Sequence, residues 1–401
     1  MKTIWKYLAY GSMAAVILAM TAATVLDRLQ GTETALSLIY HSPWFMALWG
    51  ILAVSGMVLL LMNRSVSRRT FTLGLHVALV IILAGALVTH LTGESGSLHL
   101  RAGVDTSAYE MDNGEGAPLG FGLRLERFTI DYYPGTKRPM DYRSEVTLLP
   151  DGERRTISMN HILKWNGYRF YQADYDEDLS GSILAVSHDP WGVGITYAGY
   201  LLLLVCMLGF FLEKGTAFKS YCAQVRIPRG LKAGLSVTGA LLLLGCFWLI
   251  CRNWIFAPRV PVLRSPLLWI HVGSMILCYT VFALVAVLGV IGLFQRKESV
   301  RKRLQIISLI VLYPAVFLLA FGTFLGAVWA NISWGSYWAW DPKETWALIT
   351  LLVYSMALHG GRLKVLQRPR VFHAYCIIAF LSVLITYFGV NLILGGMHSY
   401  A

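Results

Sequence analysis

Long apolar segments separated by short charged loops dominate the chain. Nine segments are apolar over about the 20 residues that a membrane-spanning helix needs, namely 6–26, 44–63, 70–92, 193–213, 232–251, 267–294, 305–330, 345–360 and 372–394. Hydrophobic residues make up 56% of the sequence and charged residues 14%, a balance typical of polytopic membrane proteins. We interpret the first segment as a retained span, the alternative being a cleaved signal peptide.

Lysine and arginine fall mainly into the loops of one side. If the nine segments alternate in direction, one set of loops holds 19 Lys and Arg residues, whereas the short loops of the other set hold 5. The positive-inside rule then places the N-terminus in the cytoplasm and the C-terminus on the outer face. The net charge of +12 is mostly this topology signal together with contact with anionic membrane lipids. Since the basic residues are spread over separate loops, we expect no nucleic-acid partner.

Residues 93–192 have a different pattern and fall on the outer side. Alternating runs such as FGLRLERFTIDYY and YRFYQADY are separated by turn signals such as PGTKRP. This pattern predicts a small β-rich domain for scaffolding or partner binding. The predicted fold is thus a polytopic α-helical membrane protein with about nine transmembrane helices and one small β-rich extracytoplasmic domain. The six cysteines are scattered without a CxxC, so a disulfide framework, a zinc site and a thioredoxin-like site are unsupported.

Four of the ten histidines fall at two depths of the predicted membrane. His76 lies six residues inside the third segment, and His359 ends the eighth, so both lie on the inner side. His271 begins the sixth segment and His398 follows the last, so both lie on the outer side. Ionisable residues inside a membrane indicate function, and imidazoles on facing helices suit the two axial positions of a haem iron. The alternative for each histidine alone is a structural hydrogen bond to a neighbouring helix.

The helix dipole adds an argument for one of the four. We expect His271 in the first turn of its helix, where the positive end of the dipole disfavours imidazolium and keeps a nitrogen lone pair available. The remaining six histidines, among them His41, His90 and His373, are interpreted as background.

Five of the thirteen tryptophans lie within the eighteen residues WANISWGSYWAWDPKETW, from Trp329 to Trp346. This segment joins two apolar segments on the outer side, and it predicts an aromatic platform for a flat apolar ligand. Trp334 and Trp338 would share a face if the segment is helical. The alternative is the ordinary enrichment of Trp and Tyr at membrane interfaces, which does not explain such crowding.

Asp341, Pro342 and Glu344 form a typical helix start at the end of this platform. Asp341 would be the N-cap, Pro342 the first helical residue, and Glu344 would bond back toward the cap. Asp341 therefore has two interpretations, a structural cap and a residue that contacts the ligand of the platform.

The same residues carry a resemblance to a known family. The segment TFLGAVWANISWGSYWAWDPKETWALITLLVYSMALH resembles the tryptophan-rich WWD signature of the haem-handling proteins of cytochrome c biogenesis, and FGVNLILGGMHSYA resembles the end of their CcsA (ResC) branch. In the first half, FTLGLHVALVIILAGALVTH and DYYPGTKRPMDYRSEVTL resemble the CcsB (ResB) partner. The chain is thus similar to a fused CcsB–CcsA cytochrome c synthase over nearly its whole length.

The resemblance implies four parts. Residues 1–92 would hold the first three CcsB-like helices, residues 93–192 the outer domain and residues 193–213 the fourth helix. Residues 214–401 would form the CcsA-like haem-handling domain, with the WWD loop at 329–346. A bacterial inner (cytoplasmic) membrane is the implied location.

The resemblance also implies residue roles. His271 and His398 would be catalytic axial ligands of haem on the outer face, His76 and His359 axial ligands at an inner entry site, and Trp334, Trp338, Trp340 and Asp341 would contact the haem. The implied enzyme is a holocytochrome c synthase. It would move haem b outward and attach it through thioether bonds to the CxxCH cysteines of an apocytochrome c, with a thioredoxin-like thiol reductant as a further partner. Two alternatives stay open: a haem exporter or chaperone without synthase activity, and a bis-histidine haem redox protein.

Overall fold

The computed structural model describes residues 2–225 and 265–395. Seven helical segments in this part of the chain are long and apolar enough to cross a membrane. They are α1 (Lys2–Gln30), α3 (Pro43–Leu61), α5 (Thr70–Thr92), α6 (Gly192–Leu212) with α7 (Ala217–Gln224), α9 (Pro266–Phe294), α10 (Glu298–Trp334), and α12 (Pro369–Leu384) with the π-helix η3 (Ile385–Leu394). The shorter ones are α2 (Thr32–Ala35), the π-helix η1 (Leu36–Tyr40), α4 (Arg64–Ser67), α11 (Pro342–Leu358) and the 3₁₀ turn η2 (Gly360–Arg362).

These helices confirm the prediction of a multi-pass helical membrane protein. They correspond to seven of the nine predicted segments. The eighth predicted segment, 345–360, is α11, whose 17 residues lie at the short end of the range for a membrane span. The fifth, 232–251, lies outside the described residues.

One eight-stranded antiparallel sheet occupies the interval between α5 and α6. Its strands are β1 (Glu94–Arg101), β2 (Asp105–Met111), β3 (Gly116–Tyr132), β4 (Pro139–Leu149), β5 (Glu153–Ser158), β6 (Leu163–Trp165), β7 (Tyr168–Tyr175) and β8 (Gly181–His188). Their order is β5-β4-β3-β2-β1-β8-β7-β6. Alternate residues such as Leu98, Leu100, Leu123 and Leu125 point into one core, as a period of two requires. The β-rich region predicted from the sequence is therefore confirmed.

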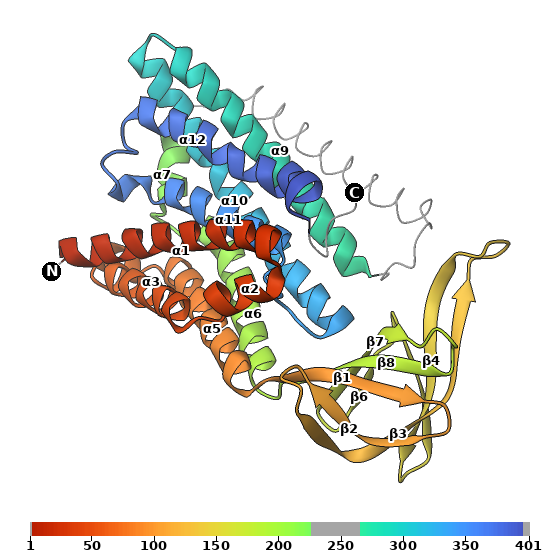
Figure 1. The fold of residues 1–401 in the computed structure, drawn as a ribbon. Helices are drawn as coiled ribbons and strands as arrows, with labels where there is room; N and C mark the ends of the chain where they lie inside the picture. Colours follow the sequence, from red (N-terminus) through yellow and green to blue (C-terminus); the bar gives the residue numbers. More distant parts are fainter. Residues whose placement is uncertain (1, 226–264, 396–401) are drawn as a thin grey trace.

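The first and last strands of the sheet are neighbours. β1 pairs with β8 in a register that places Glu94 opposite His188, so α5 reaches the sheet beside the point where α6 leaves it. The two helices then pack closely, since a Cβ added at Gly85 would lie 2.7 Å from the backbone nitrogen of Thr196. Figure 1 shows the sheet at one end of the helices, which we call the sheet end.

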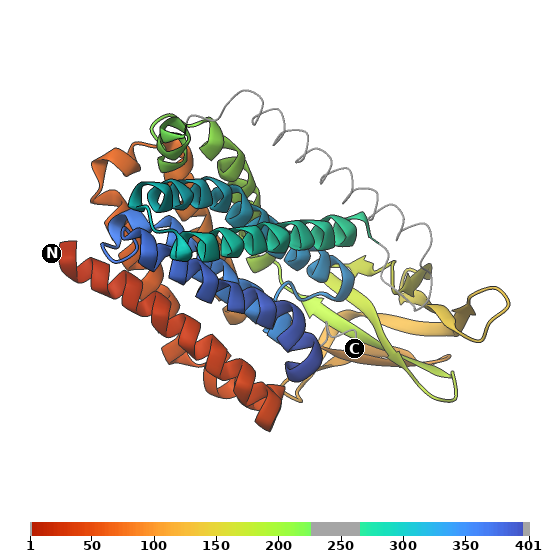
Figure 2. The same ribbon diagram turned by 90° about the horizontal axis from the view of Figure 1, so that it is seen from above.

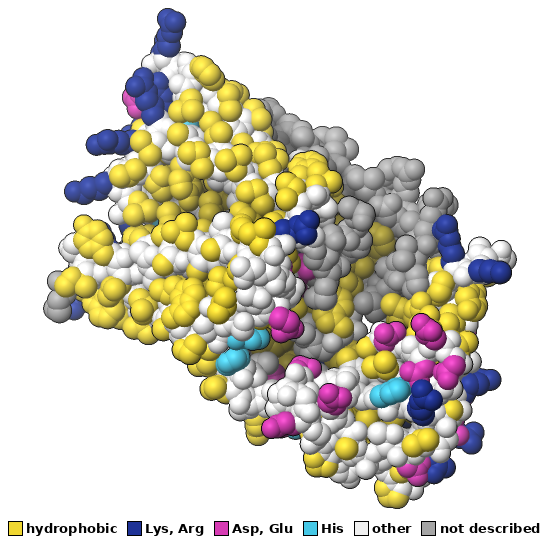
Figure 3. All heavy atoms as spheres, viewed as in Figure 1, with side chains coloured by type: hydrophobic (Ala, Val, Ile, Leu, Met, Phe, Trp, Pro, Cys, Tyr) yellow, Lys and Arg dark blue, Asp and Glu magenta, His cyan; other side chains and the backbone are white. Residues whose placement is uncertain are grey.

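Lys and Arg side chains gather at the opposite end of the helices with few acidic neighbours, whereas the sheet carries Lys and Arg together with many Asp and Glu side chains, as Figure 3 shows. We call this the basic end; it carries Arg64, Arg68, Lys219, Lys302 and Arg368 in its loops and helix ends. The N-terminus also lies there, as Figures 1 and 2 show. The two ends of the molecule therefore differ in charge and in structure.

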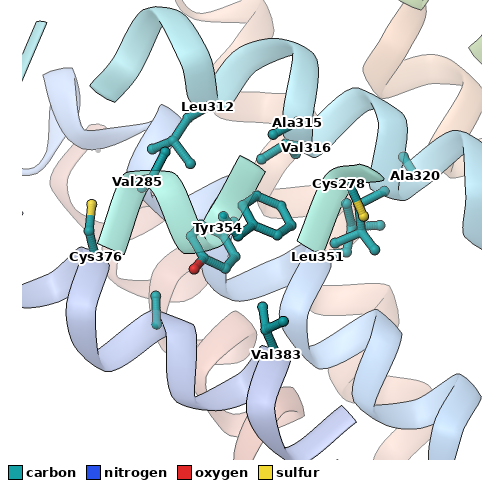
Figure 4. Packing of buried hydrophobic residues seen from close by; sticks show 14 of the residues in the cluster. Cys278, Val285, Leu312, Ala315, Val316, Ala320, Leu351, Tyr354, Cys376 and Val383 are labelled. Carbon is teal, nitrogen blue, oxygen red and sulfur yellow. The ribbon is translucent and has the colours of Figure 1, made fainter. Parts of the chain in front are cut away.

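The core of the helical part lies where α9, α10, α11 and α12 meet. Phe282 of α9 stacks on Tyr354 of α11 with 3.9 Å between ring centres, and both are fully buried. Figure 4 shows Tyr354 among Val285, Leu312 and Val383 from the neighbouring helices. Because lipid chains are as apolar as these side chains, close packing rather than exclusion of water holds such helices together.

Candidate functional site

His76 and His359 form a pair at the basic end. His76 is the seventh residue of α5, and His359 is the C-cap residue of α11. Their ring centres lie 6.1 Å apart with the ring planes at 88°. The structure thus brings together two residues that the sequence places only at similar depth, on elements nearly three hundred residues apart.

The tautomer of both imidazoles is fixed in the same way. Nδ1 of His76 donates to the carbonyl oxygen of Thr72 at 2.8 Å, and Nδ1 of His359 donates to the carbonyl oxygen of Ser355 at 2.8 Å. A carbonyl accepts and never donates, so the proton is on Nδ1 and the lone pair is on Nε2. No residue in the described part of the chain hydrogen-bonds either Nε2. A histidine that ligates a metal is oriented in this manner, with its other ring nitrogen on a carbonyl or carboxylate.

His271 lies on the sheet-end half of α9 and faces α10. The helix begins at Pro266, so His271 is its sixth residue and lies in the second turn rather than the predicted first. Its Nδ1 donates to the carbonyl oxygen of Gly322 at 2.6 Å. Gly326 makes room for the ring, since a Cβ there would lie 2.6 Å from Nδ1. His398, its predicted partner, lies outside the described residues.

The tryptophan segment is a non-helical loop between two helices. α10 ends at Trp334 because Gly335 takes the left-handed conformation with φ of 88°, which costs glycine little. Trp334 and Trp338 therefore do not share a helical face. Trp340 has φ of 58° and stacks on Tyr40 with 4.4 Å between ring centres, so it also packs on the N-terminal helices.

The tryptophan rings contact one another in pairs. Trp329 and Trp334 meet edge to face with 5.0 Å between ring centres, and Trp338 and Trp340 with 5.7 Å. The indole N–H groups of Trp329 and Trp338 are buried and have no hydrogen-bond partner among the described residues. Such donors are uncommon in folded proteins because each costs roughly 1–3 kcal/mol.

The predicted helix start is present at the end of this loop. Asp341 is the N-cap of α11 and accepts from the backbone nitrogen of Lys343 at 3.1 Å, and Pro342 is the first helical residue. Glu344 accepts from the backbone nitrogen of Ala339 at 2.9 Å, two residues before the cap. The structural interpretation of Asp341 is therefore supported, and the residue is 5% exposed.

Asn331 joins the loop to the sheet, and sequence reasoning missed it. Its Oδ1 accepts from Arg169 of β7 at 2.7 Å and from the Tyr197 hydroxyl of α6 at 3.0 Å. Its Nδ2 donates to the carbonyl oxygen of Gly335 at 3.2 Å, and its own carbonyl accepts from the Tyr171 hydroxyl at 3.0 Å. The side chain is 1% exposed. The only signal in the sequence was an asparagine in an apolar helix next to the tryptophans.

A second histidine pair was also missed. His41, just after η1, and His90, near the end of α5, have ring centres 5.7 Å apart at the sheet end. Burial, then the neighbouring His90, lowers the pKa of His41. His373, by contrast, is fully buried and donates from Nε2 to the carbonyl oxygen of Arg301 at 3.1 Å, so it ties α12 to α10.

Residues 195–398, half of the chain, match the family model described as cytochrome C assembly protein. The chain belongs to this family. Residues 56–196 match the ResB-like family, so one chain joins a ResB-like segment to a CcsA-like segment.

Similar proteins include Protein NrfI of Wolinella succinogenes, 42% identical over 151 residues, which are 35% of this chain and 17% of that protein. The cytochrome c biogenesis protein CcsA of Chlamydomonas reinhardtii is 39% identical over 155 residues, 36% of this chain and 43% of that protein. CcsA of Nymphaea alba is 35% identical over 219 residues, 46% of this chain and 68% of that protein. The chain thus spans less than half of the first two relatives.

Proposed function

We propose that this protein takes up haem b at its basic end, moves it to the sheet end, and attaches it to the CxxCH cysteines of an apocytochrome c. The basic end would face the cytoplasm and the sheet the periplasm of a bacterial inner membrane, because Lys and Arg are retained inside. The cytochrome c assembly family and the CcsA relatives support the biological process. The observation that carries the chemistry is the His76–His359 pair.

The spacing of this pair fits two axial ligands of one iron. Metal–imidazole bonds are about 2.0 Å long, so two imidazoles on opposite sides of one metal ion have ring centres roughly 6 Å apart. The observed separation is 6.1 Å. Both Nε2 lone pairs are available, and neutral imidazole is the form that binds iron. Histidines with only a structural role would need neither this separation of their ring centres nor two available Nε2 lone pairs.

Arg362 lies where a basic side chain could bind the propionate carboxylates of the same haem. It follows His359 in the η2 turn, its backbone nitrogen donates to the His359 carbonyl oxygen at 2.9 Å, and its charge acts on both imidazoles. Its guanidinium is half-buried and has no ion pair within the described chain. In this proposal it binds a haem propionate. Arg362→Gln should weaken haem binding about tenfold, the cost of a charged hydrogen bond, but leave binding of haem dimethyl ester unchanged; equal losses for both ligands would contradict this role.

In this proposal His271, at the sheet end, and His398, which lies outside the described residues, hold the iron. Trp334, Trp338 and Trp340 would pack on the haem ring, with Asp341 next to them. Burial and stacking of so large an aromatic ring contribute several kcal/mol, about 25 cal/mol per Å². A propionate would satisfy the buried N–H of Trp338. The protein would contribute to the reaction by holding the haem in position for the thiols of the acceptor.

The attachment step needs no external oxidant or reductant. Each acceptor thiol adds across one haem vinyl group, so that sulfur bonds to one vinyl carbon and the thiol proton ends on the other. The histidine of the CxxCH segment would replace a protein histidine on the iron. A thioredoxin-like reductant is needed only beforehand, to keep the acceptor thiols reduced.

The absorption spectrum of the purified protein tests the inner site. A bis-histidine haem spectrum is expected for the wild type and a large loss of haem for His76→Ala and His359→Ala. His161→Ala, at an exposed position of the sheet, is the matched control and should retain the wild-type spectrum. If both variants bind as much haem as His161→Ala, the pair does not ligate haem.

Synthase activity needs a second experiment. The chain is expressed with a CxxCH reporter in a bacterium whose own cytochrome c maturation genes are deleted. Covalent haem on the reporter, seen after denaturing electrophoresis, is the expected result. Haem that copurifies with the protein without any covalent reporter would favour an exporter or chaperone.

A further inference from the structure

The helix that carries His76 is capped by a residue from another helix. α5 begins at Thr70, and its own N-cap residue, Arg69, makes no side-chain cap. Glu213, the C-cap residue of α6, supplies the acceptor instead: its carboxylate accepts from the backbone nitrogens of Phe71 at 3.0 Å and Thr72 at 3.1 Å. The first N–H groups of a helix need such partners, and the positive end of the helix dipole favours an anion there.

Thr72 connects this carboxylate to the imidazole. Its hydroxyl donates to Glu213 Oε2 at 2.6 Å, in addition to its backbone N–H. Its carbonyl oxygen accepts from Nδ1 of His76 at 2.8 Å. Two bonds from Glu213 therefore hold the residue whose carbonyl fixes the proton of His76. The path from carboxylate to ring passes through a single residue, Thr72.

Close packing of α5 on α6 fixes the position of Thr72 relative to Glu213. A Cβ at Gly209 would lie 2.2 Å from the Phe71 ring, and one at Gly74 would lie 2.4 Å from Cys206 Sγ. The two helices cannot rotate against each other at this level without a clash. Glu213 thus fixes the first turn of α5, and the rotation of α5 determines the direction in which the His76 ring points.

We propose that Glu213 is a positioning residue for His76, which holds its ring and tautomer for iron and increases its donor strength through Thr72. This inference rests on the proposed inner haem site. A nearby negative charge favours the more positive state of the iron, so Glu213 also favours ferric haem at this site. In this proposal the residue contacts His76 only indirectly, through Thr72 and the first turn of α5.

Two substitutions separate charge from capping. Glu213→Gln removes the charge and keeps one of the two acceptor oxygens, which can still accept from Thr72 but not from Phe71 as well; it should retain a bis-histidine spectrum, while the midpoint potential of the haem becomes more positive. Glu213→Ala removes both, and haem affinity should fall about tenfold, the low end of the effect of losing a group that orients a metal ligand. Added imidazole should restore part of the spectrum of Glu213→Ala.

The matched control is Glu298→Gln, the same change at the first residue of α10, also at the basic end, where the glutamate pairs with Arg301 instead. Size-exclusion chromatography in detergent shows that each variant is folded. If the Glu213 variants match Glu298→Gln in potential and haem affinity while His76→Ala loses its haem, the positioning role is refuted and the inner site stands. If His76→Ala also keeps its haem, the proposed inner site itself is wrong.

Discussion

Asn331 offers the sharpest structural prediction, because one buried side chain links the tryptophan loop, α6 and the sheet. Asn331→Ala removes the acceptor of Arg169 and Tyr197 and the donor to Gly335. A buried polar group that loses its partner costs about 1–3 kcal/mol. Arg169 and Tyr197 are half-buried, so water partly replaces the lost partner for them. We therefore expect a loss of about 2 kcal/mol for docking of the loop on the sheet.

Hydrogen exchange measured by mass spectrometry reports the docking free energy of the loop directly. A change of about 2 kcal/mol alters an opening equilibrium by a factor of roughly 30, so backbone amides of the loop after Trp334 and of β7 should exchange faster by that order. Asn113→Ala is the matched control, since among the described residues the Asn113 side chain bonds only Glu115, at an exposed turn. In the double variant with Arg169→Ala the two effects should not add. If the exchange rates of Asn331→Ala equal those of the control, Asn331 does not hold the tryptophan loop on the sheet.

Two further predictions concern the sheet end. Gly326→Ala should push the His271 ring off its carbonyl partner and reduce haem attachment toward the level of His271→Ala, whereas Gly56→Ala, with open space around its Cβ, should leave attachment unchanged. The depressed pKa of His41 favours its neutral form in the folded protein, so stability should be unaffected above its ordinary value of 6.5 and should fall as the pH drops below that value. His90→Gln should reduce this acid-dependent loss of thermal stability; an identical pH dependence in that variant would show that the histidine contact does not matter.

Sequence patterns predicted the elements better than their contacts. Apolar segments and alternating runs follow from burial in lipid or in a sheet, and they are local, so α5, α9 and the strands appear where expected. The start of α11 was also local, since Asp341 and Pro342 cap it within one turn. The loop before it was harder, because the left-handed Gly335 ends α10 at Trp334 and cancels the helical spacing of the tryptophans.

Residue pairs between distant segments could be predicted only in part. Hydropathy gives the depth of a residue along a membrane helix, and so His76 and His359 could be assigned to one level. It does not give the direction around the helix axis, which depends on packing such as that of α5 on α6. For the same reason the contacts of Asn331 with β7, and of His41 with His90, had no sequence signal. Glu213 was one acidic residue in a basic loop and gave no hint that it caps α5.

The histidine pair at the basic end and the contacts of Asn331 combine residues from both family segments. His76 lies in the ResB-like segment and His359 in the CcsA-like segment, and Asn331 of the CcsA-like segment is held by Arg169 of the ResB-like one. Neither segment alone contains a complete histidine pair at the basic end or the full set of contacts around the loop. Because an intramolecular contact avoids the entropy cost of bringing two chains together, joining the segments in one chain keeps both sites assembled at any protein concentration. Split into two chains, the same contacts would form only where the two chains bind each other.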